Sequence, residues 1–171
     1  MKKFELTTDT KMFLGKKLFR IKALISFGNV RAGDMGGYVE KEENLSHLNE
    51  AWVYGDAWVY GNAWVSGNAR VYGNARVYGD AWVSGNARVY GDAWVYGDAD
   101  YATASGFGSE YRTTTFFKLK NSDEIGVRCG CFYGTLKEFK EKVKETHGET
   151  KKAKEYLMLA DLMEYRFSEE K

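Results

Sequence analysis

Residues 51–98 read AWVYGD AWVYGN AWVSGN ARVYGN ARVYGD AWVSGN ARVYGD AWVYGD, eight six-residue repeats without a gap. Ala opens each repeat, Val is third, Gly is fifth, and Asp or Asn is sixth. A period of six residues is too short for helical repeats and is typical of parallel β-helices. Ala and Val lie two residues apart, so on an extended segment both side chains point into the coil. The Gly-Asn or Gly-Asp pair predicts a corner, because both residue types accept backbone conformations that β-branched residues avoid.

A longer period is superimposed on the repeat. The fourth position is Tyr except at Ser66 and Ser84, which lie 18 residues apart, so three repeats make one turn of a three-sided coil. Paired strands lie about 4.8 Å apart, so side chains one coil apart stack in columns. The predicted inner columns are Val53, Val71 and Val89; Val59, Val77 and Val95; and Val65 and Val83. The predicted outer columns are Trp52, Arg70 and Arg88; Trp58, Arg76 and Trp94; and Trp64 and Trp82.

The segment before the repeats contains two strand-like runs, 17–22 and 37–40, and a degenerate first coil that caps the solenoid. His47 stands where the repeat register requires an inward aliphatic residue, so either the register slips or this coil is irregular.

After the repeats, residues 113–120 and 125–132 predict a hairpin. The sequence Thr-Leu-Lys-Glu from residue 135 is a capping box, which begins a helix that Gly148 ends. A second helix from about Thr150 has a core-facing stripe formed by Ala153, Tyr156, Leu157, Ala160 and Met163.

Together these patterns predict a mainly β protein with three parts. Residues 1–50 form the N-terminal strands and cap coil, residues 51–104 the β-helix, and residues 105–171 a hairpin followed by two helices, a ββαα unit. The last unit is small, so we expect it to dock on the open end of the solenoid or on a neighbouring subunit.

Three further stretches carry a family resemblance: Leu18-Phe19-Arg20-Ile21-Lys22-Ala23-Leu24, Ala32-Gly33-Asp34-Met35-Gly36-Gly37-Tyr38-Val39-Glu40, and Cys129-Gly130-Cys131-Phe132-Tyr133-Gly134-Thr135-Leu136. With the repeats between them, the chain resembles the hexapeptide-repeat proteins encoded by phages and prophages. The resemblance implies a left-handed parallel β-helix, whereas general crossover rules favour the right hand. It also implies a viral or prophage origin, and it brings no established catalytic residue.

The composition excludes several classes of protein. Lys+Arg number 25 and Asp+Glu 24, a net charge of +1, which argues against binding to bulk nucleic acid. Two cysteines are too few for a disulfide-stapled scaffold and fit a reducing compartment. No apolar run approaches the ~18 residues of a membrane span. We therefore expect a cytoplasmic protein that does not contact membranes, and the resemblance implies the cytoplasm of a bacterial host.

The sequence offers little for catalysis. Hexapeptide-repeat acyltransferases are CoA-dependent trimers, and deprotonating their acceptor requires a histidine base. The two histidines, His47 in the cap coil and His147 at a helix end, favour structural roles. Cys129 and Cys131, expected on one side of a strand, are too few to hold a metal, and the Gly-x-Gly at 106–108 precedes no helix. We expect neither an enzyme nor a cofactor or metal, with a CoA-dependent acyltransferase as an alternative.

Large side chains on the outer columns indicate interfaces. Five Trp, six Tyr and three Arg are expected to point outward from these 48 residues. Extended exposed apolar patches usually mark interaction surfaces, so we expect a homo-oligomer, and the family resemblance implies a trimer.

The outer columns also supply the candidate ligand-binding residues: Arg70, Arg76, Arg88, Tyr72, Tyr90, Trp58 and Trp94. Arg70 and Arg88, one coil apart, repel each other unless they stack on tyrosines or face an anion. Arg76 lies between two tryptophans, an arrangement that suits a base and its phosphates. The structural alternative is salt bridging to Asp56, Asp80 or Asp92, or to a partner subunit.

These features lead to a functional hypothesis. The protein is a non-catalytic, phage-encoded oligomer that counters host defence by sequestering a small nucleotide-like signal at grooves between subunits. The alternatives are direct blocking of a host defence protein, the acyltransferase, and a structural or virion component.

Overall fold

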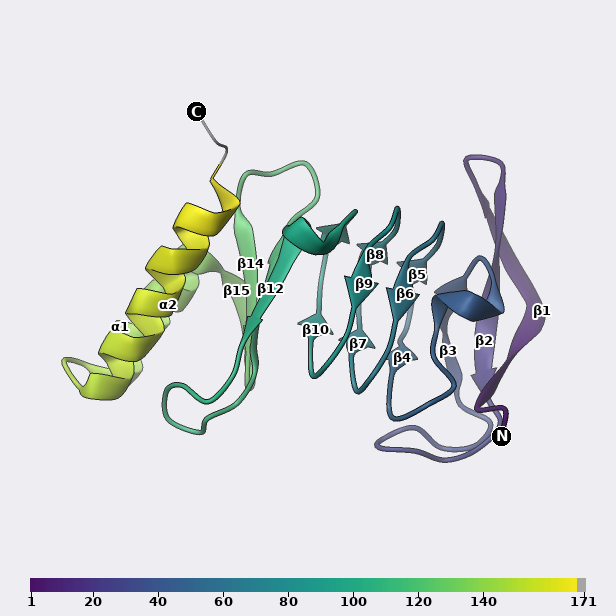
Figure 1. Ribbon diagram of the computed structural model, residues 1–171, viewed down its shortest axis with the longest axis horizontal. Helices are drawn as coiled ribbons and strands as arrows, with labels where there is room; N and C mark the ends of the chain where they lie inside the picture. The colour runs from purple at the N-terminus through teal and green to yellow at the C-terminus, as the bar shows by residue number, and fades with distance from the viewer. Residues whose placement is uncertain (169–171) are drawn as a thin grey trace.

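The repeats form a β-solenoid. The computed structural model, which describes residues 1–168, places this solenoid between an N-terminal sheet and a C-terminal sheet that carries two helices (Figure 1). Eight two-residue strands build it: β4 (Trp52–Val53), β5 (Trp58–Val59), β6 (Trp64–Val65), β7 (Arg70–Val71), β8 (Arg76–Val77), β9 (Trp82–Val83), β10 (Arg88–Val89) and β11 (Trp94–Val95). The mainly β solenoid with C-terminal helices is thus confirmed.

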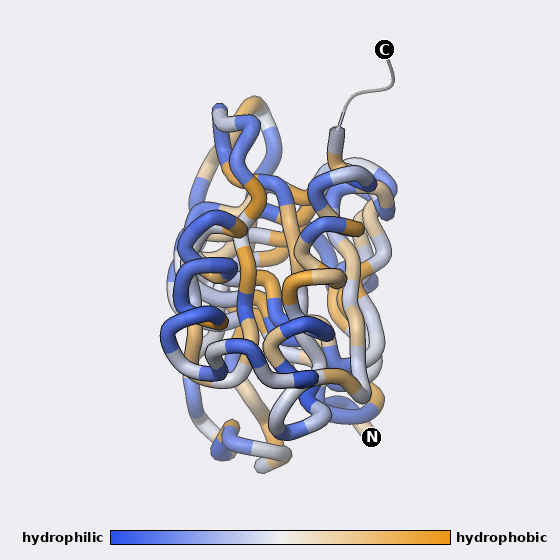
Figure 2. The backbone as a smooth tube through the Cα atoms, turned by 90° about the vertical axis from the view of Figure 1, so that its left-hand side faces the viewer, coloured by the Kyte–Doolittle hydropathy of each residue, from blue (hydrophilic) through white to orange (hydrophobic). Residues whose placement is uncertain are grey.

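Parallel pairing stacks the strands into three faces. The orders are β4-β7-β10, β5-β8-β11 and β6-β9, with residues 18 apart in register. This register produces the predicted outer columns, and the eight valines of the inner columns are all fully buried. Seen from the helical end, hydrophobic residues concentrate toward the middle of the molecule (Figure 2).

The corners depend on glycine and on side-chain amides. Each repeat from the first to the seventh turns at a glycine with positive φ, such as Gly67 at 63°. A Cβ on Gly67 would lie 3.0 Å from the backbone nitrogen of Gly85 in the next coil, so close stacking also requires glycine. Beside the glycines, amides bond from coil to coil; one example is Asn68, which donates to Asn86 Oδ1 at 3.2 Å.

An N-terminal hairpin extends one solenoid face. Strands β1 (Phe4–Phe13) and β2 (Lys16–Ala23) are antiparallel, and β3 (Met35–Val39) joins β2 to β5, which makes a six-stranded sheet. The sequence missed β1. Its partner strand begins after a two-residue turn in which Leu14 and Gly15 both have positive φ, and a leucine there is no turn indicator.

The cap coil slips in register. Leu45 bridges Val65 and Val39 pairs with Val59, each 20 residues apart, whereas the later coils repeat at 18. Leu45 therefore occupies the inward valine position, and His47 lies outside the core column. Of the two possibilities left open for this coil, the structure shows the slip.

The N-terminal segment covers Trp52, which the sequence placed on an outer column of the solenoid. Trp52 points outward from the coil but is only 1% exposed, because the rings of Phe4 and Phe27 pack on it at 6.2 and 5.3 Å. Its burial is intramolecular, so this tryptophan does not require a partner subunit.

The C-terminal unit docks on the open end of the solenoid, as predicted. Its sheet contains β12 (Tyr101–Ala104), β13 (Thr114–Lys118), β14 (Ile125–Cys129) and β15 (Phe132–Thr135), so residues 101–104 pair with this sheet. Phe117 of β13 packs into the solenoid core, and its neighbour Phe116 packs against the helices on the other side. Lys120 N–H donates to the Asp92 carbonyl at 3.1 Å across the junction.

Two helices close this end of the molecule. α1 (Leu136–His147) begins at the predicted Thr135 capping box, and α2 (Lys151–Phe167) begins at Thr150. All residues of the predicted α2 stripe are buried or pack against the core. Neither helix among residues 1–168 has the length and apolar character needed to cross a bilayer.

The prediction that Cys129 and Cys131 share one side of a strand was wrong. β14 ends at Cys129, and Gly130, at φ 56°, turns the chain into β15. The thiols therefore flank a hairpin turn, Cys129 half-buried and Cys131 exposed.

Candidate functional site

Three arginines meet at a cavity between the solenoid and the C-terminal unit. The cavity has a volume of about 540 Å³, and we call it the arginine cavity. Arg70 and Arg88 reach it from the face of β7 and β10, and Arg112 from the loop of residues 105–113 between β12 and β13. Asn68 and Asn86 supply polar groups from the corners. Glu50 is the one carboxylate that lines it among the described residues.

Arg70 is the fixed member of the set. Its guanidinium lies 3.0 Å from the Glu50 carboxylate, and its side chain is only 13% exposed. Burial opposes its charge, but hydrogen bonding to Tyr72 and to Glu50 outweighs that effect and raises the pKa of Arg70 above its ordinary value. Arg70 is therefore a permanent, oriented cation at the base of the cavity.

Arg88 and Arg112 have no strong ion-pair partner within residues 1–168. Arg88 is exposed and directly in register with Arg70. Among residues 1–168 its side chain makes no ion pair or hydrogen bond, while its backbone N–H donates to Thr115 Oγ1 at 2.9 Å. Arg112 lies 3.7 Å from Glu110, and both side chains are more than half exposed. Such a surface pair contributes little, so both guanidiniums are available to an anion.

The 105–113 loop is anchored, which fixes the approach of Arg112. Gly108 N–H donates to Glu155 Oε2 at 2.9 Å, and Ser109 N–H donates to the Tyr156 hydroxyl at 3.2 Å. A Cβ on Gly108 would collide with the Tyr156 ring, so the loop can approach α2 only with glycine here. The sequence analysis considered only the Gly-x-Gly of this segment and missed Arg112, because a single arginine in a loop carries no periodic pattern.

Arg76 lies with Trp58 and Trp94 on the neighbouring face, as their column predicted. The guanidinium carbon is 4.2 Å from the Trp58 ring, 5.4 Å from Trp94 and 4.8 Å from Phe13. The three rings bind its charge internally. A cavity of about 430 Å³ adjoins it, with Lys11 paired to Asp56 at 3.2 Å on its wall. The candidate residues thus divide between two faces.

Tyr72 and Tyr90 belong to a column of stacked phenol rings beside the arginine cavity. Tyr72 lies 4.4 Å from Tyr54 and 5.2 Å from Tyr90, and Arg128 lies 4.9 Å from the Tyr90 ring. Burial, with repulsion from Tyr72, raises the pKa of Tyr54 to about 12. Neither Tyr72 nor Tyr90 lines the arginine cavity; Tyr72 acts on it through Arg70.

Both histidines are engaged in packing. His47 Nδ1 accepts the Lys3 backbone N–H at 3.1 Å, Nε2 lies 2.7 Å from Glu42 Oε1, and the ring stacks on Phe4 at 4.2 Å. His147 stacks on Tyr156 at 5.8 Å. Residues 1–168 contain no group of three or more His, Cys, Asp or Glu side chains arranged to hold a metal.

Comparison with known proteins identifies the repeat. A family model described as the YdcK beta solenoid repeat matches residues 51–67, 69–85 and 81–97. The chain is similar to that repeat over the solenoid only, which supports a β-solenoid and assigns no ligand. No curated protein matches the chain.

Proposed function

We propose that this protein is a non-catalytic binding protein that captures a small phosphate-bearing, nucleotide-like ligand in the arginine cavity. One observation carries the proposal: three guanidiniums converge on a cavity that has, in the described part of the chain, a single carboxylate, and this carboxylate is already paired with Arg70. Guanidinium groups match phosphate oxygens in shape and charge, and Arg88 and Arg112 lack a strong partner of their own among residues 1–168. A bound phosphate would also offset the repulsion between Arg70 and Arg88.

The contacts of His47 support a binding role over acyl transfer at the cap coil. A general base needs a ring nitrogen free to accept a proton from the substrate. Both ring nitrogens of His47 already have partners within the chain, and its ring is stacked on Phe4.

The wider setting of this proposal rests on the sequence resemblance. A left-handed hexapeptide-repeat protein of phage origin, acting in the cytoplasm of a bacterial host, would hold a nucleotide signal away from the defence protein that senses it. The arginine cavity is formed within one chain, so we now place capture there instead of at a groove between subunits.

A second copy of the chain is the partner that we propose for the third solenoid face. Trp64 and Trp82 stack at 5.0 Å on β6 and β9 and are 39% and 50% exposed. The other three tryptophans are buried or half-buried by the chain itself, so this face has the strongest remaining apolar character. Light scattering should show a homo-oligomer, with the trimer favoured, that Trp64→Lys dissociates; a monomeric wild-type protein would contradict this.

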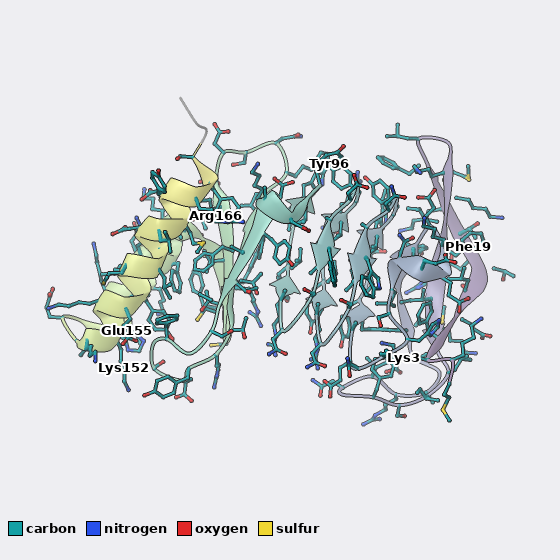
Figure 3. The ribbon with its side chains drawn as sticks, viewed as in Figure 1. Lys3, Phe19, Tyr96, Lys152, Glu155 and Arg166 are labelled. Atoms are coloured by element: carbon teal, nitrogen blue, oxygen red, sulfur yellow. The ribbon has the colours of Figure 1, made fainter. Side chains whose placement is uncertain are left out.

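Calorimetry with inorganic pyrophosphate tests capture directly. We expect Arg88→Gln to weaken binding by about tenfold or more, because a charged hydrogen bond contributes roughly 1.5–3 kcal/mol. Arg166→Gln is the control, because Arg166 is an exposed residue near the end of α2 (Figure 3). Arg166 does not line the arginine cavity. Equal affinity in the wild type and Arg88→Gln, or no binding, would refute the proposal. Recovery of a chemically altered nucleotide after incubation would indicate an enzyme instead.

A further inference from the structure

A second cavity adjoins the arginine cavity and has the opposite chemistry. It lies between α1, α2 and the β14–β15 turn, with a volume of about 290 Å³, and we call it the aromatic cavity. Phe132 and Phe139 lie 5.4 Å apart, Phe139 and Tyr156 5.7 Å, and Tyr156 and His147 5.8 Å. These four rings and Val143 form its apolar walls, and the polar side chains at its edge include Glu110, Arg112, Lys142 and Thr146.

Arg112 and Gly130 line both cavities, so the two cavities are neighbours that share a wall. The Arg112 side chain packs against the β14–β15 turn, because a Cβ added at Gly130 would lie 2.9 Å from Arg112 Nη1. The guanidinium therefore stands at the boundary, with Arg70 and Arg88 on one side and the aromatic walls on the other. An anionic group held by Arg112 would place whatever is attached to it at the mouth of the aromatic cavity.

We infer that the aromatic cavity is the second half of one binding site and takes the flat ring of the ligand. This inference rests on the proposed capture of a phosphate-bearing ligand and narrows its class to aromatic phosphates, such as a nucleotide whose base lies in the aromatic cavity. Small-molecule sites combine apolar walls with a few placed polar groups, and these two cavities divide those roles. The base thus lies here and not between Trp58 and Trp94, whose rings already hold Arg76.

The site is built from rigid parts. Phe139, Val143 and Tyr156 are nearly completely buried in the C-terminal core. The Tyr156 hydroxyl also accepts the Ser109 N–H, which ties the wall to the loop that carries Arg112. The distance between the cationic and aromatic halves is therefore fixed before a ligand binds, and preformed geometry reduces the entropic cost of binding.

The test compares pyrophosphate with ADP, which adds a base and sugar to a similar diphosphate. We expect ADP to bind the wild-type protein about tenfold or more tightly than pyrophosphate, because a stacked base contributes on the order of that factor. Thr146 is an exposed α1 residue that lines the aromatic cavity and none of the arginine cavity. Thr146→Trp should fill the aromatic cavity, remove the advantage of ADP and leave pyrophosphate binding unchanged.

A matched variant separates cavity filling from a general effect of tryptophan. Met158 is an exposed, uncharged α2 residue that does not line either cavity, so Met158→Trp should leave both affinities at wild-type values. Equal wild-type affinities for ADP and pyrophosphate, or an ADP advantage that survives Thr146→Trp, would overturn the aromatic half alone, because arginine-dependent pyrophosphate binding would persist. Absence of pyrophosphate binding would refute capture itself and this inference with it.

Discussion

Trp52 and Trp82 occupy the same position of the six-residue repeat, and replacing each with alanine tests the cover that the N-terminal segment supplies. Trp52 is 1% exposed beneath Phe4 and Phe27, whereas Trp82 is 50% exposed. Burying a tryptophan removes about 150–250 Å² from water, which at roughly 25 cal/mol per Å² stabilises the fold by about 4–6 kcal/mol. Measured losses for such core truncations are about 3–5 kcal/mol.

We therefore expect Trp52→Ala to lower the free energy of unfolding by about 4 kcal/mol. Trp82→Ala should cost about 2 kcal/mol, since half of its surface is already in solvent and it loses one hydrogen bond to Ser66 Oγ. With a urea dependence of about 2 kcal/mol per M, the midpoints should fall by about 2 M and about 1 M.

Urea unfolding followed by circular dichroism measures both variants. Each variant should be measured at two protein concentrations. An oligomer formed through the Trp82 face would make the unfolding midpoints of the wild type and of Trp52→Ala depend on protein concentration, and Trp82→Ala would weaken that dependence. Equal losses for Trp52→Ala and Trp82→Ala at the lower concentration would refute the conclusion that the N-terminal segment protects Trp52.

Further predictions concern the corners, a buried lysine, a half-buried tyrosine and a helix cap. Gly67→Ala should destabilise the protein more than Gly55→Ala. Both glycines have positive φ, which costs an L-residue roughly 1–2 kcal/mol, but only a Cβ at position 67 would contact the next coil, at 3.0 Å. Equal melting temperatures for the two variants would contradict this. Burial lowers the pKa of Lys3 to about 8 from 10.5, so the unfolded chain binds the proton more tightly and the free energy of unfolding should rise as pH increases from about 8 toward 10. Urea unfolding at each pH should show this rise in the wild type and no pH dependence over this range in Lys3→Met. Above pH 10 stability should fall, because the pKa of Tyr54 is raised to about 12 and the unfolded chain loses that proton first; a monotonic rise through pH 11 would argue against it. Thr135→Ala should lower the free energy of unfolding by about 1 kcal/mol because it removes the capping box, whereas Thr135→Ser should retain the box and its stability. Equal melting temperatures for the two variants would contradict a role for the cap.

The features of the fold that follow from the six-residue repeat could be predicted from the sequence. Columns such as Val53, Val71 and Val89 follow from a period of two within the strand and 18 between coils, and they are buried in register as predicted. The capping box at Thr135 and the α2 stripe were also readable, because they are local patterns with fixed spacing.

Only part of the candidate site could be predicted from the sequence. Arg70 and Arg88 could be placed together because they share a column, and Arg76 could be placed between Trp58 and Trp94 for the same reason. Arg112 could not, since a loop contributes to a cavity only once the sheet that carries it has docked. The same limit hid β1, whose alternation of polar residues gains meaning only from its pairing with β2.

The amino-acid sequence by itself determined the solenoid, its inner valine columns and the residues that line up on each face, because strand periodicity is a short-range property of the backbone. Tertiary structure alone decided which of those faces stay open. The N-terminal segment buries Trp52 and places the Phe13 ring over Arg76, while docking of the C-terminal sheet brings Arg112 to Arg70 and Arg88. Exposure and convergence depend on contacts between segments far apart in the chain, and no local pattern encodes those contacts.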